Sequence, residues 1–299
     1  MESGVKGFGE KIFQIIIIIF LLILSICAIL PFILLISSSL TDEKSLLSKG
    51  YNFITTDFST YAYKYLFISN GAKILKSYGI TFFITIFGTG LSLLIGPLLA
   101  YPLSRKDYSR RKLVTLLVVF TMLFNGGVVP SYLMWTQIFH LKNTIWALIF
   151  PNLLFNGFYI MLFKNSFATN IHPALIEAAK IDGAGELFIY RKIVLPLSAP
   201  ILATVGLMVG LGYWNDWTNG LYFINKVNLY SLQILLNSIM NNISALASMS
   251  TSASLSQSNL PGTGIRMAMA VIGVIPIMLL YPFFQKYFIK GITMGGVKE

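Results

Sequence analysis

Charged residues are scarce in this sequence, and that scarcity sets the class of protein. Asp, Glu, Lys and Arg make up 11% of its 299 residues, whereas soluble domains carry about 25%. Hydrophobic residues make up 56%, and the mean hydropathy is +0.74. A water-soluble core cannot absorb so much apolar surface, so the lipid bilayer is expected to be the main solvent of the chain.

Cysteine and histidine are nearly absent as well. The one cysteine, Cys27, lies in an apolar run, which excludes an intrachain disulfide and leaves a thiol enzyme without a nearby base. His140 and His172 are far apart in sequence and give little support to a metal site. The sequence also lacks a G-x-x-x-x-G-K-[ST] loop that would cradle a triphosphate. We therefore expect neither catalysis nor a metal or cofactor on this chain.

The net charge of +11 would suggest a nucleic-acid partner in a soluble protein. In a membrane protein, Lys and Arg accumulate in the cytoplasmic loops, and this accounts for the charge without nucleic acid.

Long apolar runs predict an all-α, polytopic bundle in a single transmembrane domain over residues 1–299. A bilayer-crossing helix needs about 20 mostly apolar residues. Six segments meet or approach that length: residues 12–36, 78–101, 113–134, 145–163, 199–217 and 267–288. The first is longer than a signal-peptide core of about 7–15 residues, so we expect an uncleaved anchor. Residues 241–263, rich in Ser, Ala and Asn, are expected to form a flexible outer loop.

The short segment "SRKDYSRRK" between the second and third spans decides the orientation. Because basic residues in short loops face the cytoplasm, both termini and residues 164–198 are expected on the cytoplasmic side of the cell membrane. The first outer segment contains five lysines, which favours the opposite orientation, but long loops constrain orientation less. These lysines are Lys44, Lys49, Lys64, Lys73 and Lys76.

The cytoplasmic loop 164–198 has the pattern of a helix, a turn and a second helix. Pro173 suits the first turn of a helix, and Gly183 stands where a helix end favours a left-handed residue. Glu186 begins a second helix, which Pro196 is expected to stop. On the first helix, Glu177 lies beside a narrow face of small residues that a partner could approach closely. That face consists of Leu175, Ala178, Ala179 and Asp182. From spacing alone, an amphipathic helix lying on the lipid headgroups fits equally well.

The same loop fits the pattern E-A-A, three residues, G, nine residues, I-x-L-P. The matching residues are Glu177, Ala178, Ala179, Gly183, Ile193, Leu195 and Pro196. This stretch resembles the "EAA" loop of permease subunits in ATP-binding-cassette (ABC) importers. "FNGGVVPSYL", "YWNDWTN" and "YPFFQKYFIKGITMGGVK" extend the resemblance to the carbohydrate-uptake permeases, in particular those importing sugars derived from complex oligosaccharides. At "NIHPAL" the chain departs from the family, so His172 and Ala174 carry no inference.

The resemblance implies a type I importer fold with partners on both sides of the membrane. It implies a second homologous permease chain, two ATPase subunits that hold ATP and Mg, and an extracytoplasmic sugar-binding protein. The Glu177 helix would dock in a cleft of the ATPase. The tail, including Met294, Gly295 and Gly296, would reach the ATPase interface, although in isolation it has the pattern of a frayed end.

Aromatic and amide side chains indicate where a sugar could pass. The end of the fifth span holds Tyr213, Trp214, Asn215, Asp216 and Trp217. An acid in a membrane is a functional candidate, but this segment could equally anchor the helix at the outer interface. In the fourth span, Asn152, Asn156 and Tyr159 share a helical face, where they could line a pore or bridge helices. The lysines of the first outer segment would suit a uronate-containing oligosaccharide.

Two other classes of protein compete with the importer subunit. An ion-coupled secondary transporter usually has a repeat and several intramembrane acids, and neither is found here. A non-transporting membrane scaffold would use the Glu177 helix as a general docking site.

Overall fold

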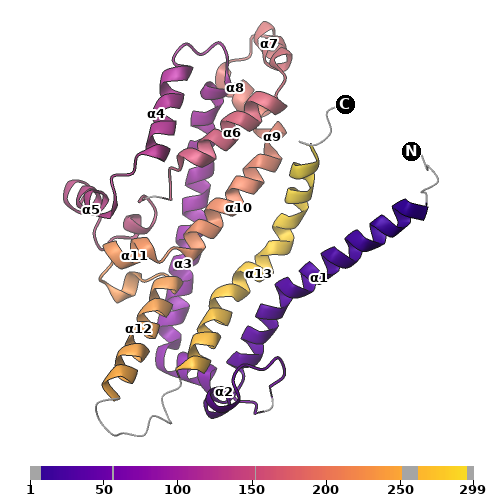
Figure 1. Ribbon diagram of the computed structural model, residues 1–299. Helices are drawn as coiled ribbons and strands as arrows, with labels where there is room; N and C mark the ends of the chain where they lie inside the picture. The colour runs from indigo at the N-terminus through magenta and orange to yellow at the C-terminus, as the bar shows by residue number, and fades with distance from the viewer. Residues whose placement is uncertain (1–7, 56, 152, 251–261, 295–299) are drawn as a thin grey trace. The chain divides into compact units, whose positions relative to one another are not determined.

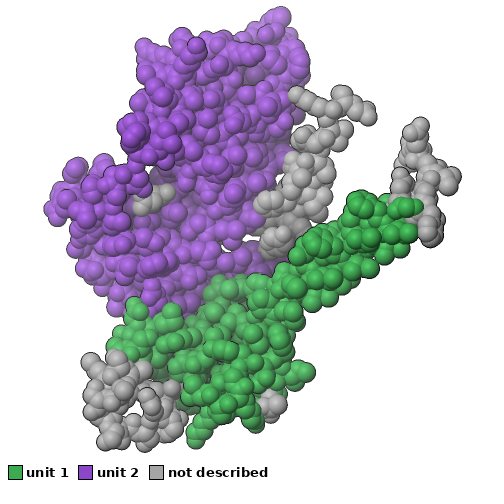
Figure 2. Space-filling model, in the orientation of Figure 1, with its two compact units in different colours: residues 1–71, 240–275 green, residues 72–239, 276–299 purple. Residues whose placement is uncertain are grey.

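The computed structural model describes residues 8–55, 57–151, 153–250 and 262–294, and the regular structure of this part consists of helices joined by loops. Within it, the single β interaction is an isolated antiparallel bridge between Thr41 and Phe58. The chain forms two compact units (Figure 2). The first contains residues 1–71 and 240–275, and the second contains residues 72–239 and 276–299.

The first unit begins with α1 (Phe8–Ser39), whose apolar side chains are almost all exposed. Residues Ile12–Ser39 are long and apolar enough to cross a membrane. Because they bury so little against their own chain, lipid or another subunit must cover them. A short helix, α2 (Glu43–Lys49), follows α1.

Glu43 binds the start of α13 (Thr263–Met294), the last helix. Its carboxylate accepts hydrogen bonds from the backbone N–H groups of Gly262, Thr263 and Gly264 at 3.2, 2.9 and 2.8 Å. These are groups that a helix start leaves without intrahelical partners, and a negative charge there also complements the helix dipole. Glu43 thus caps α13 from a distant part of the sequence.

The second expected span lies within a much longer helix, α3 (Tyr61–Ser104), of 44 residues. At a rise of 1.5 Å per residue it is about 66 Å long, roughly twice the thickness of the hydrocarbon core. The lysine-rich stretch before residue 78 is therefore helical, where a loop was expected. Ala62 and Leu66 are buried on this added part, which explains why the helix continues there.

The third expected span is broken. It consists of α4 (Arg111–Leu123), α5 (Val128–Leu133) and a π-helical turn over Met134–Ile138, with a bend of 113° between the two parts. The segment expected as the third span is therefore not one continuous helix, because "NGG" at 125–127 interrupts it. Gly127 has φ +83°, a left-handed conformation that ends the helical hydrogen-bond pattern.

The fourth expected span, 145–163, is also not one helix. A 3-10 turn covers Ile145–Leu148, and α6 (Gly157–Asn170) begins only after Pro151. Asn156 caps α6 by accepting the N–H of Phe158 at 2.9 Å. Since α6 runs to Asn170, it also extends into the segment that was expected to be a loop.

The segment expected as the fifth span, 199–217, is helical as α10 (Ala199–Asn215). Before it come α7 (Pro173–Ile181), α8 (Glu186–Ile189), a π-helical turn over Tyr190–Val194 and α9 (Leu195–Leu197). Pro196 does not stop the helix as expected, because it falls in the first turn of α9, where its missing N–H costs nothing. The chain bends by 79° between the Glu186–Leu197 segment and α10.

After α10 come α11 (Thr218–Phe223), a 3-10 turn over Val227–Leu229, and α12 (Leu232–Ser250). The start of the expected flexible loop, residues 241–250, is therefore helical, and Ile243 is buried there. Residues 251–261 lie outside the described residues.

Three helices in the described residues are long and apolar enough to cross a membrane, or up to five if each bent pair counts as one span. The all-helical class is thus confirmed, whereas six spans are not reached, because the fourth is divided at Pro151.

Within the second unit, α3 and α10 pack closely through glycines (Figure 1). A methyl group at Gly88 would overlap the ring of Tyr213, and one at Gly206 would lie 3.0 Å from Leu93. Phe163 and Phe167 of α6 join the same core, together with Ala100, Leu103, Val205 and Val209. This core holds α3, α6 and α10 together.

Candidate functional site

The Glu177 helix, α7, has one buried and one exposed side. Ile176 is buried and Ala179 packs against the core of the second unit, whereas Glu177 and Ala178 are exposed. His172 caps the helix, because its Nδ1 accepts the N–H of Ala174 at 3.3 Å. The structure therefore divides the expected small-residue face: Ala179 faces the protein and Ala178 faces outward.

The turn after α7 has the backbone that the sequence predicts. Gly183 has φ +82°, so the left-handed expectation is confirmed. The N–H of Ala184 donates to the carbonyl of Ala179 at 2.9 Å, which closes the helix end. The exposed residues on either side of this turn include Leu175, Ile181, Asp182, Leu187 and Phe188. Several large apolar side chains thus point away from the protein around one turn.

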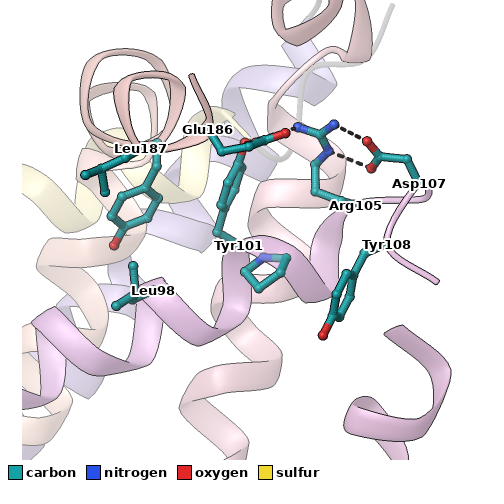
Figure 3. Close-up of a pocket in the computed structure, with 9 residues that line it drawn as sticks. Leu98, Tyr101, Arg105, Asp107, Tyr108, Glu186 and Leu187 are labelled. Carbon is teal, nitrogen blue, oxygen red and sulfur yellow. Dashed lines mark hydrogen bonds and ion pairs between the residues drawn. The ribbon is translucent and has the colours of Figure 1, made fainter. Parts of the chain in front are cut away.

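Five side chains join this loop to the end of α3, and Figure 3 shows Tyr101, Arg105, Asp107 and Glu186 among them. We call all five the charged cluster: Tyr101, Arg105, Asp107, Lys180 and Glu186. The Tyr101 hydroxyl donates to Glu186 at 2.7 Å, and Lys180 pairs with Glu186 at 2.8 Å and with Asp107 at 3.4 Å. Arg105 pairs with Asp107 through two hydrogen bonds, and its other nitrogen lies 3.5 Å from Glu186. Each basic group therefore contacts both acids.

The cluster keeps its carboxyl groups charged. The hydrogen bond from Arg105 lowers the pKa of Asp107 to about 2. The pKa of Glu186 is lowered as well, first by the hydrogen bond from Lys180 and next by that from Tyr101. Both acids are therefore ionised at neutral pH, and the ion pairs persist.

A cavity of about 510 Å³ lies beside the cluster. It has Arg105 and the two acids on its polar side, and its other lining residues are Leu98, Tyr101, Pro102, Tyr108, Leu187 and Tyr190. Figure 3 shows Leu98, Leu187 and Tyr108 around this hollow. This end of the second unit is thus held together by ion pairs next to a mostly apolar cavity.

None of the remaining coupling candidates belongs to the cluster. Ile193 and Leu195 are half-buried, and Pro196 is exposed at the bend before α10. Met294 is the last residue of α13, and Gly295 and Gly296 lie outside the described residues. Sequence reasoning missed Arg105 and Asp107, because their basic segment was interpreted only as a topology signal, and it assigned no role to Tyr101 or Lys180. The acid Asp107 within this basic segment was the signal in the sequence that could have indicated an ion pair there.

The pathway candidates on the fifth span do not converge on one site. Tyr213 is fully buried, and its hydroxyl donates to the carbonyl of Ile149 at 2.8 Å. Trp214 is buried against Tyr78 and Phe82. Asn215 and Trp217 are exposed.

Asp216 follows α10 and caps the next helix. Its Oδ1 accepts the N–H groups of Thr218 and Asn219 at 3.1 and 3.2 Å. Asn152 lies outside the described residues, and Asn156 and Tyr159 do not share a helical face, because α6 begins at Gly157. Tyr159 is half-buried and packs against the core.

A second cavity, of about 150 Å³, lies between the α4–α5 break and α11, and we call it the α5–α11 pocket. Its lining mixes aromatic rings with amides and hydroxyls: Asn125, Gly127, Val128, Ser131, Tyr132, Thr218, Asn219, Tyr222 and Phe223. Sequence reasoning did not assign Asn125, Ser131 or Tyr132 to a site, although they belong to the noted segment "FNGGVVPSYL".

The pocket and the charged cluster lie about one bilayer thickness apart along α3. Tyr132 and Phe223 pack in a core cluster with Ile80 and Ile84 of α3, whereas Tyr101 of the charged cluster lies further along the same helix. At 1.5 Å per residue, these α3 levels are separated by about 25–32 Å, close to the roughly 30 Å of the hydrocarbon core.

An all-helical fold with long apolar helices and a polar loop joined to the end of α3 is that expected of a membrane transport subunit. A family model described as "Binding-protein-dependent transport system inner membrane component" matches residues 78–294. The chain belongs to this family: it is a multi-pass permease component of ABC transporters and a non-catalytic subunit. The resemblance of the "EAA" loop is thereby confirmed.

Relatives match nearly the whole chain. It is 39% identical over 289 residues to the "Polygalacturonan/rhamnogalacturonan transport system permease protein YtcP" of Bacillus subtilis (strain 168), covering 97% of this chain and 99% of that protein. It is 28% identical over 278 residues to the "Arabinooligosaccharides transport system permease protein AraQ" of Halalkalibacterium halodurans, with 91% of each chain covered.

A solved structure is similar as well. A chain from the "Crystal structure of a bacterial ABC transporter involved in the import of the acidic polysaccharide alginate" superposes with a TM-score of 0.77 and 28% identity. The match covers 96% of this chain and 100% of that chain.

Proposed function

We propose that this chain forms half of the translocation pathway of an ATP-driven oligosaccharide importer. Its partners are a second homologous permease, two ATPase subunits and an extracytoplasmic sugar-binding protein. ATP and magnesium are held by the ATPase subunits and no cofactor by this chain. Support comes from the family and from relatives named for the transport of polygalacturonan/rhamnogalacturonan and of arabinooligosaccharides.

The proposed topology has six crossings with both termini in the cytoplasm. The fourth crossing combines α6 with the irregular segment before it, because α6 alone has 14 residues and reaches about 21 Å. Irregular backbone at membrane depth is tolerated where protein surrounds it, and Ala147, Leu148 and Ile149 are fully buried. The basic residues around Arg105 and Arg110 support the orientation.

The proposed coupling element is α7 with the turn that follows it. Its exposed side offers Glu177, Ala178, Asp182 and Ile181 to an ATPase subunit. The charged cluster joins the C-terminal end of α7, at Lys180, to α3. A displacement of α7 would therefore be passed to a helix that crosses the membrane. This link between the exposed helix and α3 is the observation that carries the proposal. A ligand-driven change requires unequal binding of two conformations, and the ATPase would supply it here.

The substrate is proposed to be a uronate-containing oligosaccharide. The Bacillus subtilis relative with 39% identity is named for polygalacturonan and rhamnogalacturonan, and the similar solved structure for alginate import. The chain itself carries a net charge of +11, with exposed Lys44, Lys49 and Lys64 in the part expected on the outer side. Anionic sugars would be attracted to such a surface.

Reconstitution of the complete importer tests the coupling role. Glu177→Ala is expected to reduce the ATP hydrolysis stimulated by the loaded binding protein at least about tenfold, a loss of about 1.4 kcal/mol in coupling. Asn165→Ala, an exposed change on neighbouring α6, is the control and should leave stimulation unchanged. Normal stimulation and uptake by Glu177→Ala, with the variant present at wild-type level in the membrane, would show that α7 does not couple.

A further inference from the structure

We infer that the α5–α11 pocket, together with Lys142, binds one carboxylated sugar residue at the outer mouth of the pathway. This inference rests on the proposed import of a uronate-containing oligosaccharide and assigns it a site on this chain. No residue of the pocket was predicted from the sequence to meet a carboxylate.

The size of the pocket suits a single sugar unit. Its volume of about 150 Å³ equals the liquid volume of roughly five waters. Drug-sized ligands need at least about 300 Å³, so the pocket is too small for a whole oligosaccharide. One residue of a chain could enter it while the remainder stays in the pathway.

The lining has the chemistry of a carbohydrate site. Tyr132 and Phe223 are stacked, with ring centroids 5.9 Å apart and an interplanar angle of 9°, and Tyr222 adds a part-exposed ring. Such rings can cover the C–H faces of a pyranose. Among the described residues, neither the Ser131 hydroxyl nor the Asn125 amide nitrogen has a hydrogen-bond partner, so both are available to sugar hydroxyls.

Lys142 supplies a positive charge at this lining. Its Nζ donates to the Tyr132 hydroxyl at 2.8 Å and lies 5.5 Å from the centre of the Tyr132 ring. In the described part of the chain no acid pairs with this lysine, so its charge is not neutralised locally. A carboxylate placed here could accept hydrogen bonds from the ammonium group, and such charged pairs are the strong ones.

The backbone around Lys142 is held in place by its neighbour. Asn143 adopts a left-handed φ of +60°, which asparagine tolerates better than most residues. Its Oδ1 accepts the N–H groups of Asn225 and Lys226 at 2.6 and 3.2 Å, and its own N–H donates to the Phe223 carbonyl at 2.9 Å. These bonds tie the lysine loop to the chain that leaves α11, so the charge and the pocket are positioned together.

Asp216 is the acid nearest in sequence to the residues that line the pocket. Asp216 is not part of the lining, and its Oδ1 is occupied by the N–H groups of Thr218 and Asn219. The pocket itself has no charged side chain in its lining. Lys142 is therefore the charge that decides between an acidic and a neutral sugar.

The test compares two trisaccharides in proteoliposomes containing the complete importer. One is trigalacturonate, and the other is the same trisaccharide with its carboxyl groups reduced to alcohols. With saturating binding protein, Lys142→Gln should lower the rate of trigalacturonate uptake about tenfold, equivalent to roughly 1.4 kcal/mol. Uptake of the reduced sugar should stay within about twofold, and Lys142→Arg should restore most of the trigalacturonate rate.

Lys226→Gln is the matched control, because it removes an equal charge from the adjoining loop and its side chain makes no polar contact with the described pocket lining. It should leave both rates near those of the wild type. If Lys142→Gln affects both sugars equally or neither, or if Lys226→Gln has the same effect, the pocket does not bind the carboxylate. A failure of the importer proposal itself would differ, because the wild-type complex would then transport neither sugar.

Discussion

The hydroxyl of Tyr101, near the end of α3, donates a 2.7 Å hydrogen bond to the carboxylate of Glu186, which begins α8. These residues are 85 positions apart, and their contact connects a membrane span with the loop that carries α7. Arg105 and Lys180 surround the same carboxylate. Movement of the loop therefore cannot leave α3 unaffected unless these bonds break.

Tyr101→Phe should weaken coupling without preventing assembly. The change removes only the hydroxyl, and a hydrogen bond to a charged group contributes about 1.5–3 kcal/mol, less where the carboxylate is solvent-exposed. We expect sugar-stimulated ATP hydrolysis to fall about two- to fivefold in proteoliposomes. Tyr108→Phe is the control, since this residue lines the same cavity and its hydroxyl makes no hydrogen bond within the described residues. Equal effects of the two changes would contradict a role for the Tyr101 bond.

The stabilisation from the cluster should depend on pH only in acid. The pKa values of Asp107 and Glu186 are both lowered in the folded protein, that of Asp107 to about 2. Groups of this kind stabilise the fold fully above their ordinary pKa, about 4, and the stabilisation is lost as the pH falls through the lowered pKa. The difference in melting temperature between wild type and Glu186→Gln should be constant from pH 8 to about 5 and shrink below about 4. A difference that shrinks near neutrality would contradict this assignment.

The sequence predicted the elements that follow directly from local chemistry. Pro173 and Gly183 marked the two ends of α7, and the apolar run before Asn215 marked α10. Such signals depend on backbone preferences within a few residues, so they can be interpreted from the amino-acid sequence alone. The family pattern around Glu177 was local in the same sense.

The breaks and the two polar sites could not be predicted in this way. Over 113–134, "NGG" indicates an interruption of the apolar run, but it does not indicate the size of the 113° bend. The charged cluster combines residues of α3 and the segment after it with residues of α7 and α8, and the α5–α11 pocket combines Tyr132 with Tyr222. Such long-range partnerships are set by packing, which periodicity does not reveal.

Gly183 should tolerate asparagine but not valine. Its φ of +82° is unfavourable for residues with a Cβ and worst for a β-branched one, while no other atom lies within 4 Å of the added carbon. The cost is therefore one of backbone conformation, about 1–2 kcal/mol for most residues and less for asparagine. We expect Gly183→Val to lower stimulated hydrolysis several-fold and Gly183→Asn to stay close to wild type. Gly185→Ala, at an ordinary φ with open space around it, is the neutral control; loss of activity there would indicate crowding in place of strain.

Gly88→Ala should destabilise the second unit through Tyr213. The added methyl would overlap the phenol ring, which is fully buried and fixed by its 2.8 Å hydrogen bond to the Ile149 carbonyl. The ring cannot move away without breaking that bond, so overpacking should cost about 1–3 kcal/mol. The expected result is a lower melting temperature of the detergent-solubilised complex.

Gly90→Ala provides the comparison for this change, because it lies on the same helix with nothing within 4 Å of the new carbon. Alanine also favours a helix over glycine by about 1 kcal/mol, so Gly90→Ala should be neutral or slightly stabilising. Since both changes gain the same helix propensity, the difference between their melting temperatures isolates the clash with Tyr213. Equal melting temperatures for the two variants would mean that α3 and α10 are not packed through Gly88.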